Sequence, residues 1–269
     1  MRATLGILGI GAIGGSIALR ARRNGMRVIG ADSEEAVLAK AHEVGAIDES
    51  GASERLFEEA DIVVIAPHLE ATVRTLEHLR STPAAATLIM DVASVKLPVV
   101  RAADGLRNFV ATHPMAGTER SGVRAARGDL FEGRTWAYAP SNDGALDRRG
   151  RDFIESMGAL PFAIAADEHD RLVALTSHVP QLVAYYYAAL LRQGDWAKAE
   201  RLCGPVASEL LRISTMKFDM WRSVLQTNAA NIEPQLRRLV RDLEGAADAL
   251  AAGGSGSVPT DSSERQAQA

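Results

Sequence analysis

The fold of this 269-residue chain is decided by the stretch Thr4-Leu-Gly-Ile-Leu-Gly-Ile-Gly-Ala-Ile-Gly-Gly-Ser-Ile-Ala-Leu19. An apolar run comes first, then Gly9, Gly11 and Gly14, and then a helix-compatible segment. Between a strand and a helix, glycines at this spacing allow a tight turn, close approach to a pyrophosphate and close helix packing. The N-terminus of the helix, which holds Ile13, faces the phosphates. We predict that these three glycines and Ile13 bind a dinucleotide; the alternative is a glycine-rich turn without a ligand.

Short apolar runs rich in β-branched residues recur along the first part of the chain, with helix-compatible stretches between most of them. This alternation predicts an α/β fold with a doubly wound parallel sheet of the Rossmann type. We expect the last two of these strands to extend the same sheet. The predicted strands are Thr4–Leu8, Arg27–Gly30, Asp61–Ala66, Thr87–Asp91, Asn108–Thr112, Thr135–Ala139 and Leu160–Ala165.

The second half of the chain shows helical spacing only. Helices are predicted at Asp170–Gln193, Ala197–Thr215 and Met220–Leu250, with breaks at Gly204-Pro205 and at Pro234. A helical unit of roughly 80 residues buries little surface alone, so we expect a homodimer.

These patterns divide the chain into three parts. Residues 1–166 form a dinucleotide-binding domain, and residues 167–250 form an all-α domain for substrate binding and dimerisation. Residues 251–269 are rich in Gly, Ser and Gln without an apolar period, which predicts a disordered tail. We expect no appended regulatory domain.

The composition favours a small-molecule ligand. A net charge of -4 provides no basic field for nucleic acid or an anionic membrane. The apolar run Leu182–Leu191 is shorter than the ~20 residues that span a bilayer. The single cysteine, Cys203, forms no disulfide within the chain, and no Cys/His/Asp cluster has metal-ligand spacing. We expect a cytoplasmic protein without a metal, membrane or nucleic-acid partner.

Asp32 points to the identity of the dinucleotide. It ends the second predicted strand, about 20 residues beyond the glycines, where a carboxylate accepts hydrogen bonds from ribose hydroxyls. A 2′-phosphate would be repelled there, and Ser33, Glu34 and Glu35 supply no cation. The sequence therefore predicts NAD as the cofactor and favours NADP less.

Two further segments end strands of the predicted sheet. Asp91–Lys96 follows one strand and His113 follows the next, so both lie at the carboxyl edge where such sheets bind ligands. A neutral imidazole is suited to take the proton of a hydroxyl whose carbon loses a hydride. We therefore predict that His113 is the catalytic base; the alternative is a histidine satisfied at a strand end.

Three motifs resemble those of one enzyme family. Asp91-Val-Ala-Ser-Val-Lys96, His113-Pro-Met-Ala-Gly-Thr-Glu-Arg-Ser-Gly122 and Ser177-His-Val-Pro180 are similar to segments of the prephenate/arogenate dehydrogenases, or cyclohexadienyl dehydrogenases. The resemblance runs from the first strand to about residue 245. It implies NAD-dependent oxidative decarboxylation of prephenate to 4-hydroxyphenylpyruvate in tyrosine biosynthesis. Arogenate or an amino-substituted prephenate is the alternative substrate.

The resemblance also implies roles for individual residues. His113 would take the proton of the ring hydroxyl, and Ser94 would bridge His113 and the nicotinamide end of the cofactor. Thr118 and Glu119 would line or gate the substrate pocket, and Arg212 would bind a substrate carboxylate. For Arg212 the alternative is a surface pair with Glu209 or Asp219.

The segment around His178 departs from the family pattern. His178 lies close to the inferred cleft, and Gln181 stands where many members carry a second histidine that is tied to the substrate side chain. An amide keeps hydrogen bonding but cannot carry a positive charge. We predict that both residues contact the substrate, whereas His169 and Asp170 cap the first helix of the second domain.

Two other functions remain open from the sequence. The first is a different Rossmann oxidoreductase, such as a β-hydroxyacid dehydrogenase or an imine reductase, which shares the fold. The second is a non-catalytic NAD-binding sensor. The combination of Ser94, His113–Gly122 and Ser177–Pro180 argues against the first. The presence of His113, Ser94 and Arg212 together argues against the second.

Overall fold

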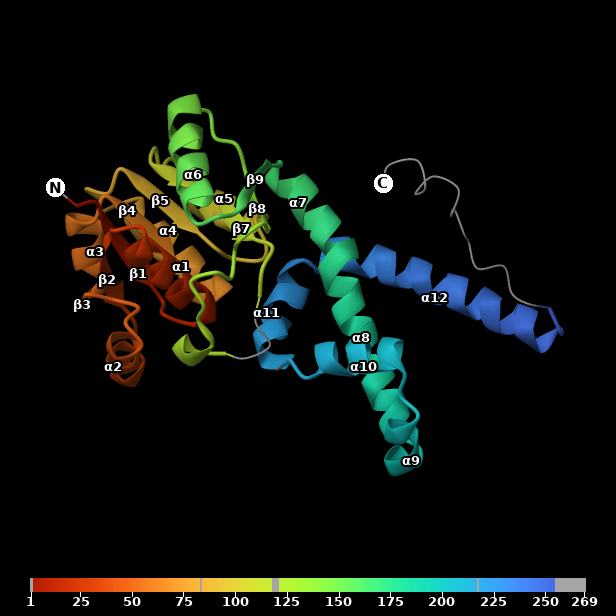
Figure 1. Ribbon diagram of the computed structural model, residues 1–269. Coiled ribbons are helices and arrows are strands. Elements are labelled where there is room, and N and C mark those ends of the chain that lie inside the picture. Colours follow the sequence, from red (N-terminus) through yellow and green to blue (C-terminus); the bar gives the residue numbers. More distant parts are fainter. Residues whose placement is uncertain (1, 83, 118–120, 217, 255–269) are drawn as a thin grey trace.

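The computed structural model describes residues 2–82, 84–117, 121–216 and 218–254, with Asp219 and Met220 described by their backbone alone. A sheet with its helices lies at one end of the chain and a group of helices at the other (Figure 1). Because the first part ends in strands and the second holds helices alone among these residues, the two-part α/β and all-α architecture is confirmed.

The central feature of the first part is a six-stranded parallel sheet in the order β3-β2-β1-β4-β5-β6. The order reverses direction between β1 and β4, and ligands of such sheets bind in the crevice at this point, beyond the carboxyl ends of the strands. The two-residue β3 was not predicted, because it is too short to show a pattern. The strands are β1 (Thr4–Leu8), β2 (Arg27–Ala31), β3 (Glu49–Ser50), β4 (Ile62–Ile65), β5 (Leu88–Asp91) and β6 (Phe109–Val110).

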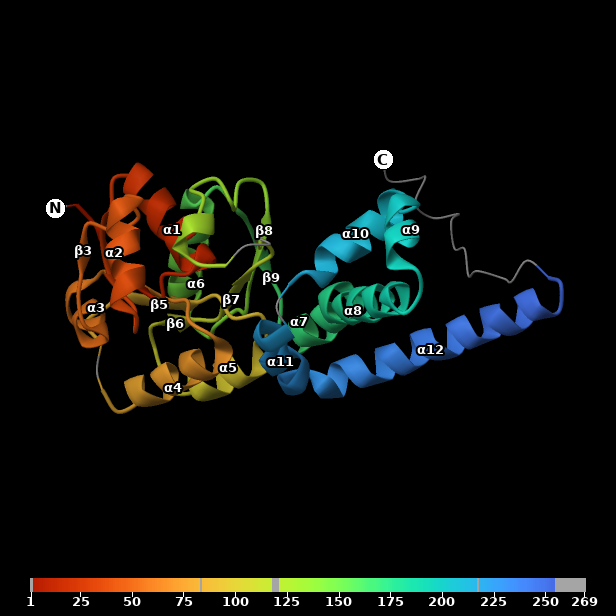
Figure 2. The same cartoon turned by 90° about the horizontal axis from the view of Figure 1, so that it is seen from below.

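Helices cover both faces of this sheet (Figures 1 and 2). The side chains of β4 alternate between two apolar clusters: Val64 packs with α1, α2 and α6, whereas Val63 and Ile65 pack with α3, α4 and α5. Burial on both faces explains the nearly continuous apolar strands of the sequence. The helices are α1 (Ala12–Arg23), α2 (Glu35–Glu43), α3 (Ser53–Glu59), α4 (Leu69–Leu79), α5 (Leu97–Ala102) and α6 (Gly144–Ser156).

The last strands do not extend this sheet, so that prediction was wrong. They form a second sheet in the order β7 (Thr112–Pro114), β8 (Thr135–Tyr138), β9 (Leu160–Ala163), in which β7 runs antiparallel to β8. The reason lies at Thr112, whose N–H donates to the side-chain Oδ1 of Asp91 at 2.9 Å. A side chain thus takes the place of a backbone acceptor, and the chain turns from the first sheet into the second.

The helical part begins with one nearly continuous helical run. It consists of α7 (Ala166–Val173), a π-helical turn (Ala174–His178) and α8 (Val179–Arg192). The run starts four residues earlier than predicted, so His169 and Asp170 lie inside α7 and do not cap it. The remaining helices are α9 (Trp196–Arg201), α10 (Pro205–Ser214), α11 (Phe218–Thr227) and α12 (Ala229–Ala251).

The helix breaks agree with the prediction at one site and differ at another. Gly204-Pro205 separates α9 from α10 as expected. Pro234 does not break the helix: it lies inside α12, and the break falls at Asn228. A proline keeps helical φ and removes one N–H, which an otherwise continuous helix tolerates at a cost.

The helical part has a sparse interior. Its buried apolar cluster contains only Ala174, Val179 and Ile232 among the described residues. In Figure 2, α12 projects away from the sheet. No helix of the described segments is both long and apolar enough to cross a bilayer. The predicted disordered tail lies outside the described residues from residue 255 onward.

Candidate active site

The glycine loop after β1 has the geometry that the fingerprint requires. Gly9 has φ +85°, and a Cβ there would lie 2.7 Å from the backbone N of Pro67, which begins the segment after β4. A Cβ on Gly14 would lie 2.1 Å from the carbonyl oxygen of Gly9. Side chains are therefore excluded at both positions, because the turn and the helix pack too closely.

Gly11 is different, since a Cβ there would meet no described atom within 4 Å. It directly precedes α1, whose first turn contains Ile13 and has backbone N–H groups without partners inside the helix. Donors and a positive helix end thus face a space that any side chain would fill. This arrangement fits the pyrophosphate of a dinucleotide.

Asp32 closes the same loop. It directly follows β2, and its Oδ2 accepts the N–H of Ile10 at 2.8 Å while its Oδ1 accepts the N–H of Glu34 at 3.1 Å. The carboxylate is half-buried and retains lone pairs for further donors. Asp32 therefore both fixes the glycine loop and offers the acceptor that ribose hydroxyls need.

A hollow beside this end of the sheet contains two cations that the sequence did not reveal. Its volume is about 230 Å³, and it lies between α2 and the segment that follows residue 120. Lys40 and Arg124 are among its lining residues, and Lys40 pairs with Glu43. Both cations lie outside Ser33–Glu35, the residues that directly follow Asp32 in sequence.

A buried ion pair lies beneath the second motif. Asp91 at the end of β5 is fully buried, and Lys96 is 2% exposed. The Nζ of Lys96 lies 2.5 Å from Oδ2 of Asp91 and 2.6 Å from the carbonyl oxygen of Thr112. Burial lowers the pKa of Lys96, and the charge of Asp91 opposes that shift. The pair joins the loop that carries Ser94 to the strand that carries His113.

His113 lies in the middle of β7, and its Nδ1 is 2.9 Å from Nε2 of His169 in α7. The two rings meet edge to face, with centroids 5.1 Å apart. Burial holds the pKa of His113 well below its usual range, and the charges of His169, Lys96 and His178 lower it further. His113 is therefore neutral near pH 7, as a base must be.

Ser94 lies between β5 and α5 with a half-buried side chain. In the part of the chain that the structure describes, it makes no hydrogen bond with His113. The bridging role of Ser94 remains a prediction.

The contact chain continues from His169 to Asp170. The Nδ1 of His169 lies 2.8 Å from Oδ1 of Asp170, and both side chains are buried. The carboxylate also accepts the N–H groups of Lys96 at 2.7 Å and Leu97 at 2.8 Å. Asp170 thus caps α5 from the other domain, which corrects the prediction that it caps its own helix. Sequence reasoning missed this role because α5 and Asp170 are distant in sequence.

His178 is buried next to the same network. Its Nδ1 lies 3.1 Å from Nδ2 of Asn228, which also donates to the carbonyl oxygen of Asp170 at 2.7 Å. The ring of Trp221 meets that of His178 edge to face. Burial lowers the pKa of His178 to about 4, against the charge of Asp170. His178 is therefore a neutral hydrogen-bonding group near pH 7.

Gln181 and Tyr185 tie α8 to α10. The Nε2 of Gln181 donates to the carbonyl oxygen of Ile213 at 3.0 Å. The hydroxyl of Tyr185 donates to the carbonyl oxygen of Met216 at 2.8 Å. Gln181 is 3% exposed. The amide thus has a structural role in this arrangement, and its substrate contact remains a prediction.

Arg212 lies on α10 with an exposed side chain. It forms a two-point pair with Glu209, with Nε to Oε2 at 2.8 Å and Nη2 to Oε1 at 2.5 Å. This is the surface pair that the sequence left open, and the carboxylate-binding role of Arg212 remains a prediction. Thr118 and Glu119 lie outside the described residues.

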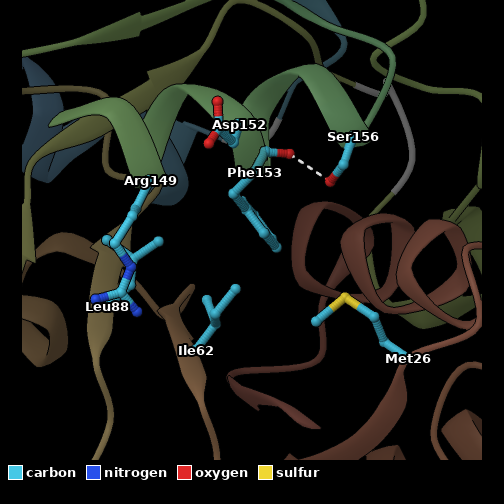
Figure 3. A pocket seen from close by; sticks show the side chains of 7 residues that line it. All are labelled: Met26, Ile62, Leu88, Arg149, Asp152, Phe153 and Ser156. Carbon is cyan, nitrogen blue, oxygen red and sulfur yellow. Dashed lines mark hydrogen bonds between the residues drawn. The ribbon is translucent and has the colours of Figure 1, made fainter. Parts of the chain in front are cut away.

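A hollow of about 290 Å³ lies at the opposite edge of the sheet (Figure 3). Ile62 and Leu88, which line it, are the first residues of β4 and β5, whereas Asp91, which is bonded to Thr112 next to His113, is the last residue of β5. This hollow is therefore separate from the His113 site. Among the described residues, no group of three His, Cys, Asp or Glu side chains is placed to hold a metal ion.

Both parts of the chain match models of one family. Residues 17–159 match the model described as prephenate dehydrogenase, nucleotide-binding domain, and residues 165–257 match prephenate dehydrogenase, dimerization domain. The chain belongs to the prephenate dehydrogenase family. It is thus an oxidoreductase with the family's nucleotide-binding domain, and its helical part matches the family's dimerization domain.

Individual members of the family are similar over nearly the whole chain. A probable prephenate dehydrogenase of Streptomyces niveus is 37% identical over 263 residues, which cover 94% of this chain and 70% of that protein. The prephenate dehydrogenase of Bacillus subtilis is 32% identical, covering 91% of this chain and 69% of that protein.

A solved structure shows the same fold. The prephenate dehydrogenase of Aquifex aeolicus in complex with hydroxyphenyl propionate and NAD⁺ is 23% identical, with a TM-score of 0.83. The match covers 94% of this chain and 92% of that chain.

Proposed function

We propose that this prephenate dehydrogenase family member uses NAD to convert prephenate to 4-hydroxyphenylpyruvate by oxidative decarboxylation, a step of tyrosine biosynthesis. The observation that carries the proposal is His113, whose pKa is lowered and which follows Thr112, the residue bonded to Asp91 at the carboxyl end of β5. At the carboxyl end of β1 in the same sheet as β5, Gly11 leaves space for a pyrophosphate. A cofactor and a base at one edge are what hydride removal from a carbinol carbon requires.

The reaction assigns His113 two proton transfers. Nε2 of His113 takes the proton of the ring hydroxyl while a hydride leaves the ring carbon that carries this hydroxyl. When bound, NAD would supply the hydride acceptor. The ring ketone then draws the electrons of the carboxylate bond, carbon dioxide leaves and the ring becomes aromatic. His113 returns its proton to the phenolate oxygen, so the site releases no net proton. Ser94 orients the hydroxyl and His113 in this proposal.

Substrate recognition requires partners for two carboxylates. Arg212 supplies a planar cation suited to one of them, and this would require it to leave or share its contact with Glu209. His178, which is neutral, and Gln181 supply hydrogen bonds without charge. Thr118 and Glu119, which lie outside the described residues, stay predicted pocket or gate residues.

Arogenate, which differs from prephenate in its side chain, is the alternative substrate, and an amino-substituted prephenate is another. A neutral His178 and an amide at Gln181 do not discriminate between these side chains by charge. The preference for prephenate is therefore supported by the similarity to the prephenate dehydrogenase of Bacillus subtilis and the probable one of Streptomyces niveus.

The cofactor preference depends on Asp32. Its carboxylate supports NAD, whereas Lys40 and Arg124, which line the hollow between α2 and the segment after residue 120, are the candidate cations for a 2′-phosphate. Asp32→Asn keeps an acceptor for the N–H of Ile10 but removes the charge. We expect it to lower the preference for NAD over NADP, measured as the ratio of kcat/KM values; an unchanged ratio would remove Asp32 from cofactor selection.

A homodimer through the helical domain completes the proposal. Large apolar side chains stay exposed on or next to its helices, including Tyr186 (73%), Leu202 (86%) and Val206 (78%). Exposed apolar surface of this kind is typical of an interface, and the family's domain carries the name of that role. A cytoplasmic location remains a prediction from the single cysteine.

The deciding experiment is NADH or NADPH formation by the purified protein with prephenate and with arogenate. We expect turnover with prephenate and NAD. Turnover with arogenate alone would establish the alternative substrate. Silence with both substrates, together with measurable cofactor binding, would favour another Rossmann oxidoreductase or a sensor.

A further inference from the structure

Two buried side chains, His169 and Asp170, form one line behind the active-site base, His113. Nδ1 of His113 contacts Nε2 of His169 at 2.9 Å, and Nδ1 of His169 contacts Oδ1 of Asp170 at 2.8 Å. His169 is 3% exposed and Asp170 is fully buried. The proposed function gives neither residue a contact with the substrate, and their role is therefore exerted through His113.

The hydrogen-bond partners of Asp170 set the direction of every bond in the line. Its two oxygens accept backbone N–H groups from Lys96 and Leu97, so Asp170 acts as the acceptor toward His169. Nδ1 of His169 then carries the proton, and its Nε2 has a lone pair. That lone pair accepts the N–H at Nδ1 of His113. Nε2 of His113 is left without a proton, which is the form that a base requires.

We propose that His169 and Asp170 form a proton relay that holds His113 as the Nδ1–H tautomer and takes up the positive charge when His113 accepts a proton. The inference rests on the proposed function of His113 as the base. His169 and Asp170 are thus positioning residues, since they act through His113.

The transfers balance within the site. When Nε2 of His113 gains the substrate's hydroxyl proton, the proton on Nδ1 of His113 moves to Nε2 of His169. The positive charge then lies on the ring next to the Asp170 carboxylate. When the phenolate oxygen of the product takes its proton from Nε2 of His113, the proton on Nε2 of His169 returns to Nδ1 of His113, and no electrons or further reactants are involved.

The surroundings make the position of Asp170 important. Lys96 also lies near His113, but its charge is paired with Asp91, and His178 is neutral. If the positive charge stayed on His113, it would have no carboxylate partner, and burial would disfavour it. A charge on His169 gains a direct carboxylate contact, as an imidazolium does in a Ser-His-Asp triad.

The tautomer can be tested without turnover. The chain has six histidines, so ¹⁵N-histidine labelling of the full-length protein gives few imidazole signals, which His→Gln variants assign. We expect both His113 and His169 to carry the proton on Nδ1 in two-dimensional ¹H–¹⁵N spectra near pH 7. A proton on Nε2 of His113 would overturn the proposal.

Two amide variants test the relay in catalysis. His169→Gln can accept from His113 and donate to Asp170 but cannot carry a positive charge, whereas the shorter His169→Asn reaches only Asp170. We expect kcat to fall by about 10-fold in H169Q and by about 100-fold or more in H169N, with KM nearly unchanged. A wild-type kcat in H169N would overturn the relay. A rise in KM without a fall in kcat would also overturn it.

Controls separate the possible failures. His78→Gln changes an exposed histidine of α4 and should leave kcat unchanged. NADH binding and thermal melting show whether each variant is folded, and a misfolded H169N leaves H169Q to decide by its kcat. Should the wild-type protein turn over neither prephenate nor arogenate, the proposed function fails, and the tautomer spectra alone decide the proposal about His169.

Discussion

Nδ1 of His113 lies 2.9 Å from Nε2 of His169, although the two residues are 56 positions apart and belong to different domains. The proposed catalytic base, in the nucleotide-binding domain, is thus in direct contact with the first helix of the dimerization domain. Asp170 extends the connection by capping α5. The orientation of the base therefore depends on the docking of the two domains.

Replacement of His113 tests its role as the base. We expect His113→Asn to retain NAD binding and to lower kcat with prephenate by about 10²–10⁴-fold, the usual effect of losing a general base. Steady-state kinetics and NADH titration measure the two quantities. Near-normal turnover would show that another group takes the hydroxyl proton.

The pH profile tests the environment of His113. Because burial lowers its pKa, the neutral base persists as the pH falls through the ordinary histidine value of about 6.5. His178, with a pKa lowered to about 4, stays neutral over the same range. We expect kcat/KM for prephenate to stay level through pH 6.5 and to decline only in more acidic solution. An acid limb centred at or above 6.5 would contradict the burial of His113.

Arg212 is tested by a comparison of two arginines. Arg212→Ala should raise the KM for prephenate by about 10- to 100-fold with a smaller effect on kcat, because a charge-assisted bond to a carboxylate is lost. Arg241→Ala removes an exposed arginine of α12 and serves as the control. Equal KM values in the two variants would reduce Arg212 to the surface partner of Glu209.

The ion pair of Asp91 and Lys96 predicts a pattern of stabilities. Lys96→Met leaves the buried carboxylate without its cation, and we expect the free energy of unfolding in urea to fall by about 3–5 kcal/mol. Asp91→Asn combined with Lys96→Met removes both charges and should recover part of this loss. A double variant less stable than K96M would show that the contacts of Asp91 with the backbone dominate.

The glycine loop and the strands of the first sheet were predictable because their signals are local. Gly9, Gly11 and Gly14 act within one turn, and the apolar runs show burial on both faces directly. The same holds for Asp32, which lies at a fixed distance along the chain from the loop that it closes.

The contacts that sequence reasoning missed all join distant segments. Lys96 contacts the carbonyl oxygen of Thr112, 16 positions away, and the separation of 74 positions between Lys96 and Asp170 hides the cap of α5. The second sheet was missed because its cause is a side chain, Asp91, that takes a backbone acceptor's place. A His-Asp pair after a predicted Rossmann domain is the one signal that could have directed attention to His169.

The small interior of the helical domain makes its stability a question of mass action. The buried apolar residues that the structure describes in this domain are few and mostly alanines and valines, so we expect a large part of its folding free energy to come from a second copy in the proposed dimer. Dilution would then favour unfolding, and the melting temperature would rise with protein concentration. The folded fraction of such an enzyme falls when its concentration falls, so the amount of active enzyme depends on the concentration of the protein itself.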